Sequence, residues 1–111
     1  MADTTTESPV RDLLVSMTAE SLAASDLDTE TLMLVRIAAL VAADAPPVSY
    51  MLNLEAARSV GIDAEKVSSV IAAIAPIVGT ARVASAAGSI LKALAIEIEI
   101  ELEELEEQDA Q

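Results

Sequence analysis

The chain has 111 residues and a formal net charge of -13, and it contains neither cysteine nor histidine. Its length fits a single domain. The missing residue types exclude disulfides, thiol nucleophiles, imidazole bases and metal sites built from thiolate or imidazole ligands. Its six Lys and Arg residues are scattered singly, which argues against binding to nucleic acid and to an anionic membrane.

Hydrophobic residues make up 53% of the chain, whereas aromatic residues make up only 1%. A core of small aliphatic side chains lets helices approach closely, so the composition favours an all-α fold. The longest apolar run, residues 32–43, contains Arg36 and falls short of the roughly 20 residues of a membrane-spanning helix. The opening residues MADTTTESP lack the basic and apolar regions of a secretory signal, so a cytoplasmic location is expected.

Residues 1–8 are polar and rich in threonine, and we expect them to be flexible. Ser8 then offers an N-cap and Pro9 a first helical residue, which predicts a helix that runs to about Ala24. Its apolar residues recur at helical spacing, as in a helix that packs on the rest of a domain. They are Val10, Leu13, Leu14, Met17 and Leu22.

The second predicted helix covers residues 29–43, with Asp28 as its N-cap and Glu30 in its first turn. Apolar residues occupy all of its faces, a pattern typical of a helix surrounded by protein, and Arg36 is the exception. The consecutive residues Pro46 and Pro47 end this helix and begin another.

The third predicted helix runs from Pro47 to Val60 and stops at Gly61. A fourth begins after Asp63, carries one apolar face (Val67, Val70, Ile71 and Ile74), and is ended by Pro76 and Gly79.

The fifth predicted helix begins at Thr80, which we expect to act as its cap. Its apolar stripe consists of Val83, Ala87, Ile90, Leu91 and Leu94, and Gly88 or the neighbouring alanines would permit close helix packing.

The C-terminal sequence IEIEIELEELEEQDAQ is compatible with two structures. Its strict alternation of Ile and Glu has the period of a half-buried strand. However, no breaker separates it from the fifth helix, and Ile98, Leu102 and Leu105 prolong the stripe of that helix, so we favour a continuous helix. A frayed acidic tail beyond Glu104 is the alternative. In the helix, Ile96 and Ile100 fall away from the stripe and become candidates for an intersubunit contact.

Three stretches follow one another in the order LDTETLMLVRIAALVA, LNLEAARSVGIDAEKV and IAPIVGTARVASAAG. In this order they resemble the carboxymuconolactone decarboxylase and alkylhydroperoxidase D-like family. The resemblance implies an orthogonal bundle of about five helices over residues 9–95, followed by an acidic helical extension over residues 96–111. It also implies a homo-oligomer, either a trimer or a hexamer.

The peroxidase branch of that family carries a Cys-x-x-Cys pair followed four residues later by histidine. The matching positions here are Pro46, Ser49 and Asn53, which cannot supply thiol or imidazole chemistry. The relay glutamate of that branch falls near Leu34, with Glu30 one turn earlier. The lactone decarboxylases of the family also use a histidine, so the resemblance implies a member without these chemistries, and we expect no cofactor and no metal site.

Four residues are candidates for binding a small molecule. Arg36 could clamp a substrate carboxylate, or it could form a salt bridge with Glu55 or with another subunit. Ser49 and Asn53 share one face of the third helix, where the family has its pocket, but they also fit an ordinary helix surface. Tyr50 could donate a proton, or it could be a core residue with its hydroxyl at the edge.

Asp44 and Glu30 are weaker candidates, because a general base at either position would need burial to raise its pKa. Asp44 precedes the Pro46-Pro47 turn and Glu30 lies in the first turn of a helix, and both are ordinary structural positions for an acidic residue.

Two functions follow. The first is a non-redox, homo-oligomeric member of the resembled family that binds or transforms a small carboxylated ligand. The alternative is a non-catalytic assembly or interaction protein that keeps the fold and has lost the active site.

Overall fold

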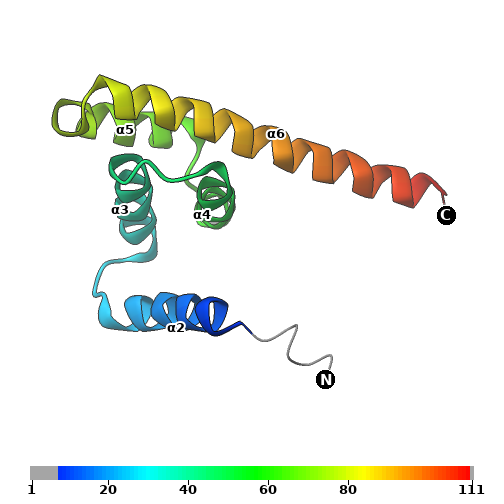
Figure 1. The fold of residues 1–111 in the computed structure, drawn as a ribbon, viewed down its shortest axis with the longest axis horizontal. Coiled ribbons are helices and arrows are strands. Elements are labelled where there is room, and N and C mark those ends of the chain that lie inside the picture. Colours follow the sequence, from blue (N-terminus) through cyan, green and yellow to red (C-terminus); the bar gives the residue numbers. More distant parts are fainter. Residues whose placement is uncertain (1–7, 111) are drawn as a thin grey trace.

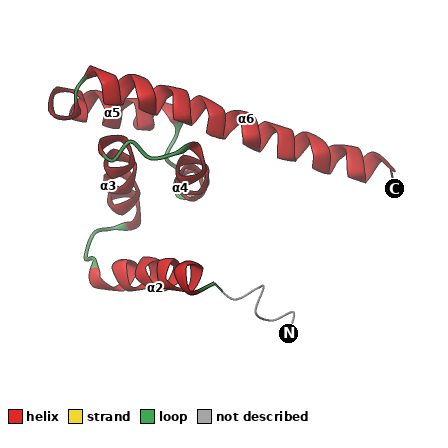
Figure 2. Ribbon diagram, viewed as in Figure 1, coloured by secondary structure: helices red, strands yellow, loops and turns green. Residues whose placement is uncertain are grey.

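The computed structural model describes residues 8–110, and these form five α-helices and no β-strand (Figure 1, Figure 2). The predicted all-α fold of about five helices is therefore confirmed. Except for Ser8, the residues that we expected to be flexible lie outside this described range. The helices are α2 (Pro9–Ala24), α3 (Thr29–Ala42), α4 (Pro47–Ser59), α5 (Ala64–Val78) and α6 (Thr80–Ala110).

Side-chain caps fix the start of three helices, as the sequence predicted. The Ser8 hydroxyl accepts a hydrogen bond from a first-turn backbone amide of α2 at 3.2 Å. Asp28 accepts one from α3 at 2.7 Å, and Asp63 accepts one from α5 at 2.8 Å. Each bond satisfies an amide that has no partner within its own helix.

The break between α5 and α6 differs from the prediction. Pro76 lies inside α5, which continues to Val78, because a proline in the last turn removes only one helical hydrogen bond. Gly79 forms the break, with φ of 87° and ψ of 165°, a conformation that is essentially restricted to glycine. Thr80 is the first residue of α6 rather than its cap, and the Gly79 carbonyl accepts the first bond of that helix.

Four helices form the body of the molecule, and α3 lies at its centre. Helix α3 packs against α4, α5 and α6, and α6 also packs against α4 and α5. Figure 1 shows α5 and α6 side by side, with α3 and α4 crossing beneath them at steep angles. The largest fully buried side chains are Tyr50, Ile37 and Val41, which belong to α3 and α4.

The sequence predicted that α3 is surrounded by protein on all sides, and the structure contradicts this prediction. Its buried residues are Leu32, Met33, Ile37 and Val41. Val35 lies on another side and is 52% exposed. The apolar pattern of this helix therefore extends beyond the side that the other helices cover.

Helix α6 packs through its small residues. Ala86 and Ala93 are buried, and Ile90 is half-buried against the core. Gly88 has no neighbouring atom within 4 Å of where a Cβ would lie, so the alanines, and not Gly88, allow the close approach. Leu91 and Leu94 of the predicted stripe remain exposed.

Helix α2 stands apart from the body, contrary to the prediction that it packs on the domain. Its backbone lies close to none of the other helices, and none of its residues is buried. The entire predicted stripe is exposed, including Leu13 and Met17. The Cα radius of gyration is 16.5 Å, whereas a compact chain of this length has about 13 Å.

The C-terminal extension is helical, so the favoured continuous helix is confirmed and the strand is wrong. Helix α6 continues through residues 96–110 and projects beyond α4 and α5 (Figure 1). Ile96 and Ile100, the candidates for an intersubunit contact, are 39% and 44% exposed.

Candidate functional site

Three of the four candidate residues lie on the first two turns of α4. The Asn53 side-chain amide donates a hydrogen bond of 2.8 Å to the Ser49 backbone carbonyl, one turn earlier in the same helix. Asn53 and Ser49 therefore share one face, as their spacing predicted. This hydrogen bond joins the Asn53 side chain to the backbone of its own helix.

Tyr50 is more deeply buried than the sequence suggested, with no exposed surface. Its hydroxyl has no hydrogen-bond partner in the described part of the chain. Burial raises the pKa of the Tyr50 hydroxyl, and the negative charge of Asp44 raises it further. A buried polar group without a partner is destabilising, which makes this hydroxyl the most unusual polar atom of the core.

Asp44 has a structural role at the end of α3. Its φ of 55° places it in the left-handed region, and the Ala45 amide donates back to the Leu40 carbonyl at 3.0 Å, as in a Schellman-type helix end. The Ser85 hydroxyl of α6 donates to the Asp44 carboxylate at 2.5 Å. Asp44 therefore joins the end of α3 to α6.

Arg36 connects α3 to the detached helix α2. Its Nη2 atom donates a hydrogen bond of 3.1 Å to the Ser21 hydroxyl. Arg36 as a residue is half-buried, although its hydrogen bond to Ser21 is exposed, and no ion pair joins it to Glu55 in residues 8–110. Among these residues its partner is thus a neutral hydroxyl and not the carboxylate expected for a structural salt bridge.

Glu30 forms a surface ion pair. Its carboxylate lies 3.0 Å from the Lys66 ammonium, and this contact joins the first turn of α3 to the first turn of α5. The hydrogen bond and charge of Glu30 raise the pKa of Lys66. Both side chains are about half exposed, so Glu30 lacks the burial that a general base would need.

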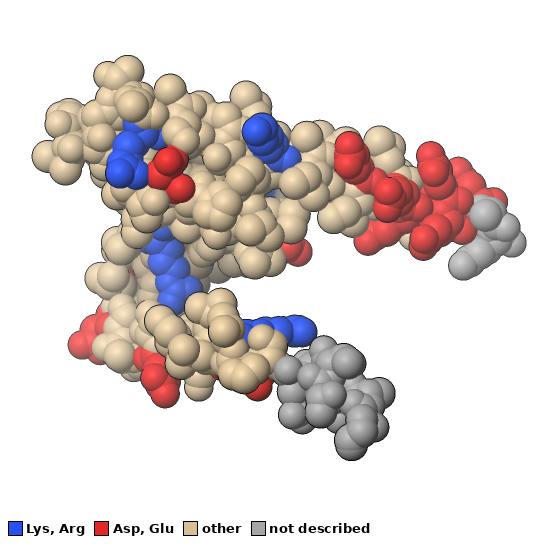
Figure 3. Space-filling model, in the orientation of Figure 1, with Lys and Arg blue, Asp and Glu red and all other residues tan. Residues whose placement is uncertain are grey.

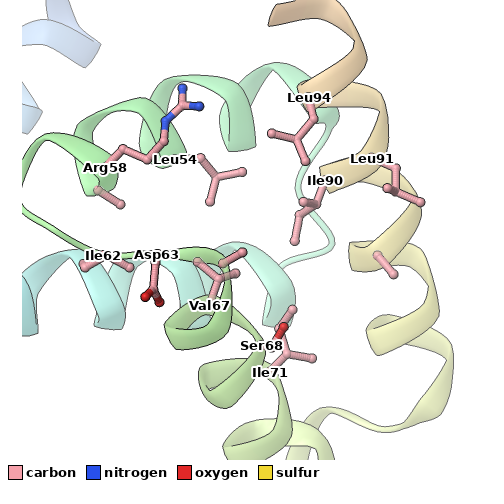
Figure 4. Close-up of a pocket in the computed structure, with 13 residues that line it drawn as sticks. Leu54, Arg58, Ile62, Asp63, Val67, Ser68, Ile71, Ile90, Leu91 and Leu94 are labelled. Carbon is pink, nitrogen blue, oxygen red and sulfur yellow. The ribbon is translucent and has the colours of Figure 1, made fainter. Parts of the chain in front are cut away.

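An apolar groove of the described structure lies elsewhere. It has a volume of about 380 Å³ and is enclosed by residues of α4, α5 and α6 (Figure 4). Its lining is mainly apolar, with Leu54, Val67, Ile71 and Ile90 among the wall residues and Arg58 at its edge. None of the four candidate residues lines it. The apolar faces of residues 64–78 and 80–94 were the sequence signal for its walls.

Charge is distributed unevenly over the surface. Figure 3 shows the largest group of acidic side chains on the projecting part of α6, with other acidic side chains and the Lys and Arg residues dispersed over the rest of the visible face. In the described residues, no group of three or more acidic side chains is arranged to hold a metal ion. None of the helices described is long and apolar enough to cross a bilayer.

Comparison with known protein families gives one match, which covers residues 9–92 and is described as the Carboxymuconolactone decarboxylase family. Neither a curated protein nor a solved structure matches the chain significantly. Because the chain contains no cysteine, it is not a thiol-dependent peroxidase. The family match extends from the first residue of α2 into the first half of α6, so the protein belongs to the Carboxymuconolactone decarboxylase family.

Proposed function

We propose that the protein is a non-redox, homo-oligomeric member of its family whose role is assembly, without catalysis at the family's usual site. The observation that carries this proposal is the bare helix α2. The residues of its apolar stripe are 51–67% exposed, and one hydrogen bond from Arg36 connects its side chains to α3. Soluble monomers rarely expose contiguous apolar surface of this kind, which usually marks an interface.

The uncovered side of α3 supports the same proposal. Val35 is exposed on α3, the central helix of the body, and Ile96 and Ile100 are exposed on α6. The trimer or hexamer implied by the resemblance would supply the missing cover from other copies. Closed homo-oligomers are the commonest way to bury such surfaces.

Sedimentation equilibrium at micromolar concentration tests the assembly. We expect the wild-type chain to be a trimer or hexamer, and we expect the double variant Leu13→Glu, Met17→Glu to dissociate, because both charges enter the apolar stripe of α2. Ser16→Glu adds one negative charge on the polar side of α2, where the double variant adds two on the apolar side, and serves as the control. A monomeric wild-type chain would refute the proposal.

A second candidate function is the binding of a small carboxylated or lactone-type ligand. The guanidinium of Arg36, which has only a neutral hydroxyl as its hydrogen-bond partner among the described residues, and the unpartnered hydroxyl of Tyr50 favour it. Arg36 would hold the carboxylate, while Tyr50 or a carboxylate would move a proton. We rank it second because Tyr50 is closed off from solvent and the candidate residues do not line the groove.

Calorimetric titration with an unsaturated six-carbon dicarboxylate tests this second function. Arg36→Ala is expected to abolish binding and leave the oligomer intact, while the exposed Arg82→Ala serves as the control for loss of a positive charge. Binding that persists in Arg36→Ala would exclude Arg36 as the clamp.

A further inference from the structure

Helix α6 carries an apolar stripe that leaves the groove and continues along the projecting extension. Its members are Ala87, Leu91, Leu94, Ile98, Leu102 and Leu105, and the five large ones are 37–68% exposed. The pattern repeats after 11 residues, from 91 to 102 and from 94 to 105. Because 11 residues make almost three full helical turns, the stripe runs nearly straight along the helix.

The spacing of this stripe is symmetric about Ile98. Leu91 and Leu105 lie seven residues to either side, and Leu94 and Leu102 lie four residues to either side. Two such helices that run antiparallel, related by a two-fold axis at Ile98, therefore bring apolar residues together at the levels of Leu91, Leu94 and Ile98. An isologous interface needs this kind of self-complementary surface.

The charges of α6 decide the direction of the pair. Residues 97–109 contain eight acidic residues and no basic one, whereas residues 80–96 contain no acidic residue and carry Arg82 and Lys92. A parallel pair would set the two acidic segments side by side, which is repulsive. An antiparallel pair centred on Ile98 sets each acidic segment against the part of the other helix that includes Lys92.

Lys92 has a specific place in this arrangement. In the antiparallel register it lies at the level of Glu104 of the second copy. By helical angle, Glu103 and Glu106 of that copy fall on the same flank of the stripe as Lys92. The sole lysine of α6 would thus face carboxylates.

We propose that α6 is a docking surface for the α6 of a second copy, packed antiparallel about Ile98. Leu102 and Leu105 of each copy would cover Leu94 and Leu91 of the other, at the edge of the groove between α4, α5 and α6. The extension lies outside the family match, which ends at residue 92. This pairing rests on the proposed assembly function and names one of its interfaces, and it requires the hexamer because a trimer has no two-fold axis.

The absence of cysteine makes disulfide cross-linking a direct test. Under mild oxidation, Ile98→Cys is expected to convert most of the chain to a covalent dimer, because the two-fold axis brings both copies of residue 98 together. Leu105→Cys alone should stay uncross-linked, since its two copies lie about 21 Å apart along the helices. A mixture of the Leu91→Cys and Leu105→Cys chains should form a mixed dimer, and Glu107→Cys, on the opposite face, controls for random collision.

Each other outcome contradicts the pairing. Cross-linking of Leu105→Cys with itself would indicate a parallel pair, and failure of every stripe position to cross-link would indicate that another partner, such as a basic amphipathic helix, covers the stripe.

Sedimentation separates this inference from the assembly proposal. Ile98→Glu should weaken the α6 pair by about tenfold or more, because two carboxylates would meet on the axis, while circular dichroism should show the same helix content. A wild-type oligomer without the Ile98→Cys cross-link would overturn only the α6 pairing, whereas a monomeric wild type would overturn both.

Discussion

Tyr50 combines full burial with a hydroxyl that has no hydrogen-bond partner among the described residues. Such a hydroxyl lowers stability relative to a phenyl ring of the same shape, since its water is lost and no bond replaces it. Tyr50 is also the only tyrosine, so its ionisation can be followed without interference.

The first prediction concerns the alkaline titration of Tyr50. Burial and Asp44 raise its pKa in the folded chain above the unfolded value of 10.0, so the folded state binds this proton more tightly. Its contribution to stability is complete below about pH 10 and is lost as the pH rises through the folded pKa. Absorbance at 295 nm should therefore rise at higher pH in the native chain than in denaturant.

A matched variant checks the cause of this pH dependence. Tyr50→Phe should reduce the alkaline loss of stability, measured by urea unfolding at pH 9 and pH 11. It should also leave the stability at pH 7 unchanged or higher. Coincident titrations in the native and denatured chain would contradict the burial of the hydroxyl.

The second prediction concerns Ile37 at the centre of the core, whose side chain is fully buried. Ile37→Ala should lower the free energy of unfolding by about 2–5 kcal/mol, because it removes apolar contacts and leaves a cavity. On the same helix, Val35 is 52% exposed, and Val35→Ala should cost less than about 1 kcal/mol. Chemical denaturation of both variants in monomeric conditions checks the contrast.

At the scale of single elements, glycine has opposite roles in a helix end and in a helix interior. Gly61 terminates α4 with φ of 88°, and Gly88 lies within α6. Neither has an atom within 4 Å of where a Cβ would lie. Any effect of alanine at either position therefore comes from the backbone and not from a steric clash.

The third prediction follows from this difference. Gly88→Ala should stabilise the chain by roughly 0.5–1 kcal/mol, because alanine favours the helix and restricts the unfolded state. Gly61→Ala should destabilise it by about 1 kcal/mol or more, since alanine disfavours a positive φ. Urea unfolding midpoints check both, and equal signs would be inconsistent with these backbone conformations.

In α2, the sequence pattern predicts the helix but not what surrounds it. Its sequence forms a capped helix with an apolar stripe, and the structure confirms the helix. The stripe nevertheless has no partner in the described chain. The helix-forming signal is local, whereas the cover of the stripe depends on what lies nearby.

The whole molecule leaves much of its apolar surface uncovered. Its dimensions of 48 × 35 × 27 Å reflect the detached helix α2 and the projecting α6. If other copies cover these surfaces, assembly and folding are linked, and the stability of the chain depends on its concentration.

The fourth prediction is therefore a concentration-dependent thermal midpoint. Calorimetry should show that the midpoint of the wild-type chain rises with protein concentration, since only folded chains assemble into the oligomer. The Leu13→Glu, Met17→Glu variant should lose most of this dependence, and Ser16→Glu should keep it. A constant midpoint in the wild-type chain over a hundredfold range would contradict coupling between assembly and folding.

The sequence allowed most helix boundaries to be predicted because local groups determine them. Ser8, Asp28 and Asp63 cap their helices, and Gly61 follows the end of α4. Thr80 was misassigned, since Gly79 takes the cap position with a conformation that a residue pattern does not reveal.

The candidate site was less accessible to prediction. Shared helix faces, such as that of Ser49 and Asn53, follow from spacing alone. The burial of the Tyr50 hydroxyl, the Arg36 contact with Ser21 and the groove depend on how distant segments meet.

The sequence by itself determined an all-α chain of the Carboxymuconolactone decarboxylase family without thiol chemistry, because helix signals and missing residue types can be read without knowing neighbours in space. Only the tertiary structure decided which apolar faces are buried. Helix α3 uses one side for the core, α6 packs through Ala86 and Ala93, and α2 packs on nothing in the described chain. Burial depends on non-local contacts, and the same apolar stripe can serve as core or as interface.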